Sequence, residues 1–206
     1  MSQLNAGRTN EAELDADAEV EADAEALSPA RGLVESSLNE QLGETGFAVG
    51  DLAVYPAQGV ARVEEIRQMM ISGSLRSFYV LKILKTDRKV MVPVDTLKYV
   101  GVRRLLNEEQ LSELFALLVE RSLAGQPAIA WHRRYKNFID KISSGSPYDL
   151  AEVFRDLHRQ SREKQLSYGE RQVLNKARAL LSREISLVRG QTEEEVGREL
   201  DGLLGG

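Results

Sequence analysis

The sequence predicts an α+β protein, with a small Tudor-like or SH3-like antiparallel β-barrel followed by a compact bundle of about five helices. Three observations lead to this fold class. Acidic residues are concentrated near the N-terminus, short β-branched runs separated by turn signals follow, and the apolar spacing then becomes helical. We therefore expect a disordered acidic extension over residues 1–45, the barrel over residues 46–103 and a helical domain over residues 104–206.

The N-terminal extension carries most of the negative charge. Residues 1–44 contain 11 acidic residues and two arginines, a net charge of −9, whereas residues 46–206 contain 25 basic and 21 acidic residues, a net charge of +4. From Glu11 to Glu25 an acid stands at every second position, which places like charges four residues apart in any helix. Few large apolar groups are present to offset the entropy of ordering. We interpret the extension as a disordered solubilising tail, with a nucleic-acid mimic that competes for a basic surface as the alternative.

The composition argues against several functional classes. With no cysteine there is no disulfide, thiolate nucleophile or thiolate metal site, and two histidines, His132 and His158, are too few for a histidine-rich metal site. No apolar run reaches the roughly 18 residues of a membrane span, and the N-terminus lacks the pattern of a secretory signal. No phosphate loop or catalytic constellation stands out. We predict a cytoplasmic protein that is not an enzyme, with no cofactor, metal, membrane or small-molecule partner.

Residues 46–100 have the pattern of about four or five short strands. Their turn signals are Gly50-Asp51, Pro56-Ala57-Gln58-Gly59, Ser72-Gly73-Ser74 and Thr86-Asp87-Arg88. Because a proline cannot donate to a β-ladder, Pro93 predicts that its strand lies at a sheet edge, with Met91 on the same face of the strand. Such an edge can dock a partner's strand, or Pro93 can simply block pairing against aggregation. Both interpretations stay open.

From residue 107 onward the apolar period is helical, and start and stop signals alternate. The start signals are Asn107 with Gln110, Ser146 with Pro147, Ser167 with Glu170, and Thr192 with Glu195. The stop signals are Gly125-Gln126-Pro127, Ser144-Gly145 and Gly190. These signals delimit the helices of the predicted bundle.

A basic and aromatic stretch opens the second of these helices. Trp131 is the only tryptophan, and at helical spacing Arg133, Arg134 and Lys136 lie off its apolar face, open to solvent. An aromatic ring beside three cations suits a nucleic-acid backbone, because the cations hold phosphates and the ring stacks on or wedges between bases. The alternative is that Trp131 is a core anchor and the cations form a solvated face.

Two further cations, on a later helix, are candidate contacts to a nucleic-acid backbone. Lys176 and Arg178 have no acid within four residues in sequence, whereas most other cations of the bundle have an acidic neighbour with which to pair.

From about Phe47 to Leu204 the sequence resembles the CarD/CdnL family of bacterial RNA polymerase-binding transcription factors. The segments that carry the resemblance are Val49-Gly50-Asp51 through Tyr55-Pro56, Gly59-Val60, Phe78-Tyr79-Val80-Leu81-Lys82, Val92-Pro93, Val100-Gly101-Val102-Arg103, Trp131-His132-Arg133-Arg134-Tyr135, Ala151-Glu152-Val153-Phe154-Arg155-Asp156-Leu157 and Ser167-Tyr168-Gly169-Glu170-Arg171. Each segment alone is weak, but their order and spacing together are specific. The resemblance implies the same fold, a Tudor-like barrel followed by a helical domain.

The resemblance also implies two partners. In the family the barrel binds the polymerase β subunit through a strand whose motif falls here on Met91 and Pro93. Another branch has arginines where this chain has Met69 and Met91, so this sequence resembles an apolar variant of that contact.

The second implied partner is promoter DNA near the upstream edge of the bubble. The family's tryptophan, which wedges into the minor groove there, aligns with Trp131, and its basic partners align with Arg133 and Arg134. His132 stands where relatives carry serine or asparagine. The competing hypothesis is an adaptor that docks on polymerase and whose helical domain binds another protein.

Overall fold

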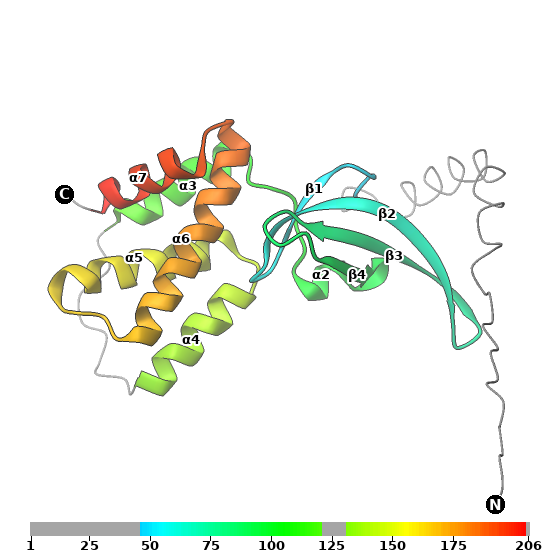
Figure 1. Ribbon diagram of the computed structural model, residues 1–206, viewed down its shortest axis with the longest axis horizontal. Coiled ribbons are helices and arrows are strands. Elements are labelled where there is room, and N and C mark those ends of the chain that lie inside the picture. Colours follow the sequence, from blue (N-terminus) through cyan, green and yellow to red (C-terminus); the bar gives the residue numbers. More distant parts are fainter. Residues whose placement is uncertain (1–45, 121–130, 205–206) are drawn as a thin grey trace, which may run out of the picture. The chain divides into compact units, whose positions relative to one another are not determined.

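The computed structural model describes residues 46–120 and 131–204, which belong to one compact unit, without the side chains of Trp131 and His132. The predicted disorder of the acidic extension falls outside these residues. The elements are β1 (Leu52–Tyr55), β2 (Gly59–Ile71), β3 (Ser74–Ile83), β4 (Lys89–Pro93), η2 (Val94–Thr96), α2 (Leu97–Val100), α3 (Glu108–Val119), α4 (Trp131–Ser143), α5 (Pro147–Glu163), α6 (Tyr168–Arg189) and α7 (Glu193–Leu203). Strands followed by helices confirm the predicted α+β class (Figure 1).

The four strands form one antiparallel sheet in the order β1-β2-β3-β4, so β1 and β4 are its edges. Among the described strands β4 pairs only with β3, where Phe78 lies opposite Pro93, and the prediction that Pro93 marks an edge strand is confirmed. The sheet curls into a half-barrel. It does not close, because the outer side of β1 makes an isolated bridge from Val54 to Arg103 instead of pairing with β4.

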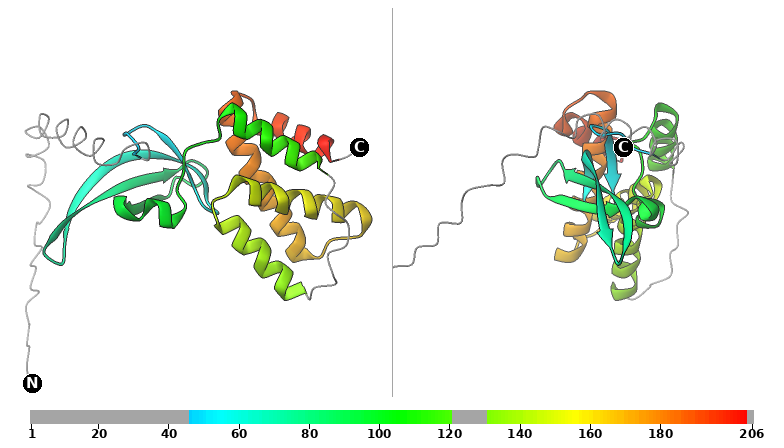
Figure 2. Two further views of the ribbon diagram at one scale, coloured as in Figure 1. Left: turned by 180° about the vertical axis from the view of Figure 1, so that it is seen from behind. Right: turned by 90° about the vertical axis from the view of Figure 1, so that its right-hand side faces the viewer.

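The strands β2 and β3 continue past both edge strands as a two-stranded hairpin (Figures 1 and 2). β1 pairs with β2 over residues 59–62 and β4 with β3 over residues 78–82, whereas β2 and β3 pair out to Ile71 and Ser74. Ser72 and Gly73 join them with φ of 52° and 79°. Two successive residues with positive φ are the geometry whose twist matches that of the flanking strands. The turn predicted from Ser72-Gly73-Ser74 is confirmed.

Alternation along the strands separates the two faces of the sheet. The core face carries Phe47, Ala53, Ala61, Val63, Tyr79, Leu81, Ile83 and Val92, which pack with Leu97 and Val102. A bulge between Val63 and Glu65 shifts the register by one residue, which returns Ile66 to the core face opposite Tyr79. The intervening residues of β3 and β4 therefore point to the opposite face.

The helices begin where the sequence predicts. Asn107, Ser146, Ser167 and Thr192 each accept a hydrogen bond from the backbone N–H three residues later, and α6 ends at Gly190 with φ of 65°. The five helices α3 to α7 share a core of Leu106, Leu111, Leu114, Leu118, Ile142, Leu150, Ala151, Val153, Phe154, Leu157, Val173, Ala177, Leu181, Ile185, Val196, Leu200 and Leu204. The predicted bundle is confirmed. None of the described helices combines the length and the apolar character that crossing a membrane requires.

Candidate functional site

The sheet brings Met69, Met91 and Pro93 onto one face. Pro93 lies opposite Phe78 and Met91 opposite Val80, while the alternate residue Val92 is buried in the core. On the hairpin, Met69 lies opposite Arg76, two residues from the Phe78 position. Met91 and Met69 are 41% and 39% exposed. This surface, which we call the methionine face, therefore presents two partly exposed apolar side chains, Met91 on the edge strand β4 and Met69 on the hairpin strand β2.

The cations at the start of α4 do not share one environment. Arg133 and Lys136 are exposed, as expected. Arg134 is half-buried: its Nη2 lies 3.2 Å from Glu170 Oε1 and its Nη1 donates to Gln160. The interpretation that all three cations are open to solvent is wrong for Arg134, because a carboxylate on α6 holds it against the bundle.

The apolar stripe of α4 turns outward toward the beginning of the helix. Ile142 is buried and Phe138 is half-buried, but Tyr135 is exposed. Trp131 begins α4, and its side chain lies outside the described part of the molecule. Burial along the described part of this stripe thus decreases from Ile142 through Phe138 to Tyr135.

Glu170 is a buried carboxylate that joins three helices. It is 5% exposed and accepts hydrogen bonds from Gln160 Nε2 at 2.6 Å and from the Ser167 backbone N–H at 2.8 Å, besides the pair with Arg134. Burial by itself raises the pKa of Glu170, but the hydrogen bonds from Ser167 and Gln160 and the charge of Arg134 outweigh it and lower the pKa. The ionised carboxylate therefore fixes α4 against α5 and the start of α6.

Replacing Glu170 with glutamine is expected to lower the free energy of unfolding at neutral pH by about 1–3 kcal/mol, since the hydrogen bonds then lose their charged acceptor. A depressed folded pKa gives stability that is present above the unfolded value, near 4.5, and lost as pH falls through the folded pKa. The difference between wild type and Glu170→Gln in urea denaturation should therefore shrink in acid. Glu199→Gln, at a carboxylate that pairs with Arg189 on the surface, is the control. A difference that stays constant with pH contradicts this role of Glu170.

The two cations singled out on α6 also differ from each other. Lys176 is exposed. Arg178 donates two hydrogen bonds to Asp201 of α7, with Nε 3.0 Å from Oδ1 and Nη2 2.7 Å from Oδ2. It also packs against Gly197, where an added Cβ would lie 2.6 Å from Nη2. No acid lies within four residues of Arg178 in sequence, but Arg178 is nevertheless paired, because Asp201, 23 residues away in the chain, lies next to it in the fold. A phosphate would have to compete with this carboxylate.

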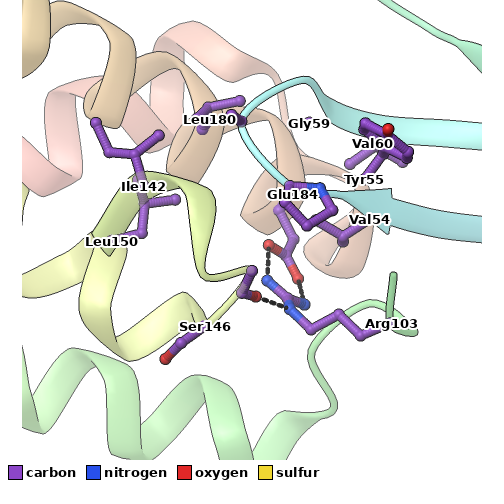
Figure 3. A pocket seen from close by; sticks show the side chains of 13 residues that line it. Val54, Tyr55, Gly59, Val60, Arg103, Ile142, Ser146, Leu150, Leu180 and Glu184 are labelled. Carbon is purple, nitrogen blue, oxygen red and sulfur yellow. Dashed lines mark hydrogen bonds and ion pairs between the residues drawn. The ribbon is translucent and has the colours of Figure 1, made fainter. Parts of the chain in front are cut away.

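Sequence reasoning misses three acids that pair with arginines from distant parts of the chain. It identifies Glu170 only as part of a helix cap, and it does not identify Glu184 or Asp201. Glu184, on α6, is 2% exposed and pairs with Arg103, which follows α2 (Figure 3). No local signal predicts that these acids pair with arginines, because the partners lie 36, 81 and 23 residues away.

The cavity beside Arg103 and Glu184 holds only about 20 Å³. It is lined mainly by apolar side chains, including Val54, Ile142 and Leu180 (Figure 3). Ligand pockets are of the order of 300–1,000 Å³, so this space suits packing between the sheet and the helices and not a small molecule. Nor do the described residues contain a group of three or more acidic or histidine side chains placed to hold a metal ion.

Comparisons with known proteins match both parts of the chain. A family model described as the CarD-like/TRCF RID domain matches residues 47–106, and one described as the CarD C-terminal domain matches residues 113–201. YdeB, a candidate transcription factor of Bacillus subtilis (strain 168), is 28% identical over 150 residues, which cover 73% of this chain and 97% of YdeB.

Two solved structures from Myxococcus xanthus each match about a third of this chain. The structure described as CdnLNt is 41% identical and covers 32% of this chain and 93% of its own, with a TM-score of 0.28. The 72-residue N-terminal domain of CarD is 35% identical and covers 30% of this chain and 83% of its own, with a TM-score of 0.26.

Proposed function

We propose, because this chain belongs to the CarD/CdnL family of transcription factors, that it docks on the β subunit of bacterial RNA polymerase and stabilises the open promoter complex. One observation carries the proposal. The same compact unit presents an apolar face on an edge strand, at Met91 and Pro93, and a helix that begins at Trp131 with Arg133 and Lys136 exposed.

The methionine face is the proposed polymerase contact. Met91 is already on the surface, so a partner that covers it removes apolar area from water without unfolding anything, a gain of about 25 cal/mol per Å². The edge of β4 offers backbone groups to a partner strand, and the side chains of alternate residues supply the selectivity. Met69 extends the same face along the hairpin.

The start of α4 is the proposed DNA contact. Arg133 and Lys136 are exposed and can reach phosphates, which orient a protein on a duplex without reading its sequence. Trp131 would then wedge at the upstream edge of the bubble and oppose rewinding. Unstacking costs about a few kcal/mol per step. Docking through the sheet raises the local concentration of α4 at the promoter, so a weak DNA contact is sufficient.

The lifetime of polymerase–promoter open complexes tests the proposal directly. We expect saturating protein to lengthen the lifetime, measured as the decay of complexes after a competitor traps free polymerase. A lifetime that is unchanged, while the protein is shown to be bound to polymerase, would contradict the proposed stabilisation and leave only docking.

The salt dependence of DNA binding distinguishes cations that contact phosphates from cations that stabilise the bundle. Arg133→Ala and Lys136→Ala are each expected to lower affinity and to reduce the slope of log K against log salt by about 0.9 for each phosphate that is no longer neutralised. Arg178→Ala should instead lower the thermal stability of the bundle and leave the slope unchanged, because Arg178 is bound to Asp201. Lys176→Ala decides whether the exposed cation of α6 joins the same surface. Equal slopes for wild type and both α4 variants would remove α4 from the interface.

An adaptor without a DNA contact is the second candidate, and one observation favours it. Arg134 and Arg178, two of the cations that the sequence predicts to contact DNA, are bound to carboxylates within the bundle. In that case Trp131 would be part of the core. Since Trp131 is the only tryptophan, its fluorescence discriminates: blue-shifted, quencher-resistant emission favours burial, whereas red-shifted, easily quenched emission favours the DNA wedge.

A further inference from the structure

Arg103 belongs to the sheet by its backbone and to the helices by its side chain. Its backbone exchanges two hydrogen bonds with Val54 of β1, of 2.7 and 3.2 Å. Its guanidinium donates to both carboxylate oxygens of Glu184 on α6, at 2.6 and 2.9 Å, and its Nε donates to the Gly145 carbonyl at 2.7 Å (Figure 3). This forked contact links the sheet to α6 and to the turn that precedes α5.

Glu184 depends on Arg103 for its charge pairing. Within the described part of the chain, Arg103 is the cation that pairs with Glu184, and the backbone N–H of Leu106 also donates to Oε1, at 3.1 Å. A carboxylate that is 2% exposed is stable as an ion only when its charge is paired, so removal of Arg103 would leave a buried charge uncompensated. Loss of this pair would therefore destabilise the junction between the sheet and α6.

Two glycines beside this pair, Gly145 and Gly59, lie so close to their neighbours that a side chain would not fit easily. A Cβ on Gly145 would lie 2.6 Å from the Gly101 carbonyl oxygen and 3.1 Å from Pro56 Cγ. A Cβ on Gly59 would lie 3.1 Å from Leu180 of α6. Such close packing resists sliding between the sheet and the helices, and it explains glycine at these positions.

We propose that Arg103 and Glu184 are positioning residues that hold the sheet and the helical bundle as one rigid body, so that docking of the methionine face sets where α4 meets DNA. This inference rests on the proposed function, since it assigns the two contacts to one chain. A wedge must reach a particular base step. Rigid coupling concentrates α4 at that step, whereas a loose junction spreads it over a larger volume and lowers its effective concentration.

Distance measurements between two spin labels test the coupling without polymerase or DNA. The chain has no cysteine, so Lys85→Cys in the turn after β3 and Asn175→Cys on α6, both exposed, give one labelled pair. We expect a narrow distance distribution in the wild-type background and a clearly broader one with Arg103→Ala. Arg103→Lys, which keeps the charge but cannot form the fork, should be intermediate and serves if the alanine variant does not fold.

Arg104→Ala is the matched control. Arg104 is the neighbouring arginine, but it donates to the Gly46 carbonyl at 2.6 Å and pairs with Asp51, both on the sheet side. With Arg104→Ala, the distribution of distances between the two spin labels should remain narrow. If Arg103→Ala and Arg103→Lys both keep the wild-type distribution, or if Arg104→Ala broadens it equally, the proposal is wrong.

The second measurement is the open-complex lifetime with the Arg103→Ala variant. Arg103→Ala should bind polymerase and DNA separately with wild-type affinity, yet lose at least about 90% of the lifetime extension, about a tenfold effect. A full extension in a variant with a broad distribution would overturn the link between rigidity and function. If wild type itself gives no extension but Arg103→Ala still broadens the distances, the coupling stands and the proposed function falls.

Discussion

Trp131→Ala is expected to return the open-complex lifetime to the value measured without the protein, while binding to polymerase is unchanged. Alanine is too small to occupy a base step. Polymerase binding is unaffected because the methionine face lies on the sheet, whereas Trp131 lies on the separate helix α4. If the wedge supplies about 1.4–3 kcal/mol toward the open state, the lifetime should fall by about 10- to 100-fold. Competitor-challenge kinetics and a polymerase pull-down together measure both quantities.

The control for Trp131 is another aromatic residue of the helical bundle. Tyr168 begins α6 and is 72% exposed, so Tyr168→Ala removes a surface ring without touching the core. It should keep the full lifetime extension. If Trp131→Ala retains the extension, the wedge is excluded; if it unfolds the bundle in circular dichroism, Trp131 belongs to the core and the adaptor hypothesis gains.

Met91→Asp is expected to reduce polymerase binding by at least about 100-fold, or about 2.7 kcal/mol. The substitution removes an apolar anchor and places a carboxylate where a partner would desolvate it. Because Met91 is already 41% exposed on an edge strand, the fold itself should tolerate the change. Titration of a purified β-subunit fragment gives the affinity, and circular dichroism confirms the fold.

The register supplies unusually close controls for this prediction. Met69 lies on the methionine face, whereas its neighbour Met70 lies opposite Leu75 on the other face and is 69% exposed. Met69→Asp should weaken binding, and Met70→Asp should leave it unchanged. Equal losses for both would mean that the hairpin end, and not one face of the sheet, makes the contact. Unchanged binding for Met91→Asp would remove the methionine face from the interface.

Some of the structural features behind these two predictions can be predicted from the sequence, and others cannot. The edge position of Pro93 is predictable, because a missing backbone donor is a property of the residue itself. The caps at Asn107, Ser167 and Thr192 are predictable for a similar reason, since each bonds only three residues away. The open half-barrel is harder to predict from the sequence. Whether the barrel closes depends on whether its two edge strands pair, and here β1 bridges to Arg103 instead of pairing with β4.

The α+β class, the order of strands and helices, the turn at Ser72-Gly73 and the exposed cations Arg133 and Lys136 all follow from sequence. These features depend on interactions within a few residues or on periodicity along one element. Folding in three dimensions, in contrast, pairs Arg134 with Glu170, Arg178 with Asp201 and Arg103 with Glu184. Each pair joins elements that are distant in the chain. Which charges pair depends on their distance in the folded structure and not on their separation in sequence. Counting acidic neighbours in sequence therefore cannot tell which arginines remain available to a partner.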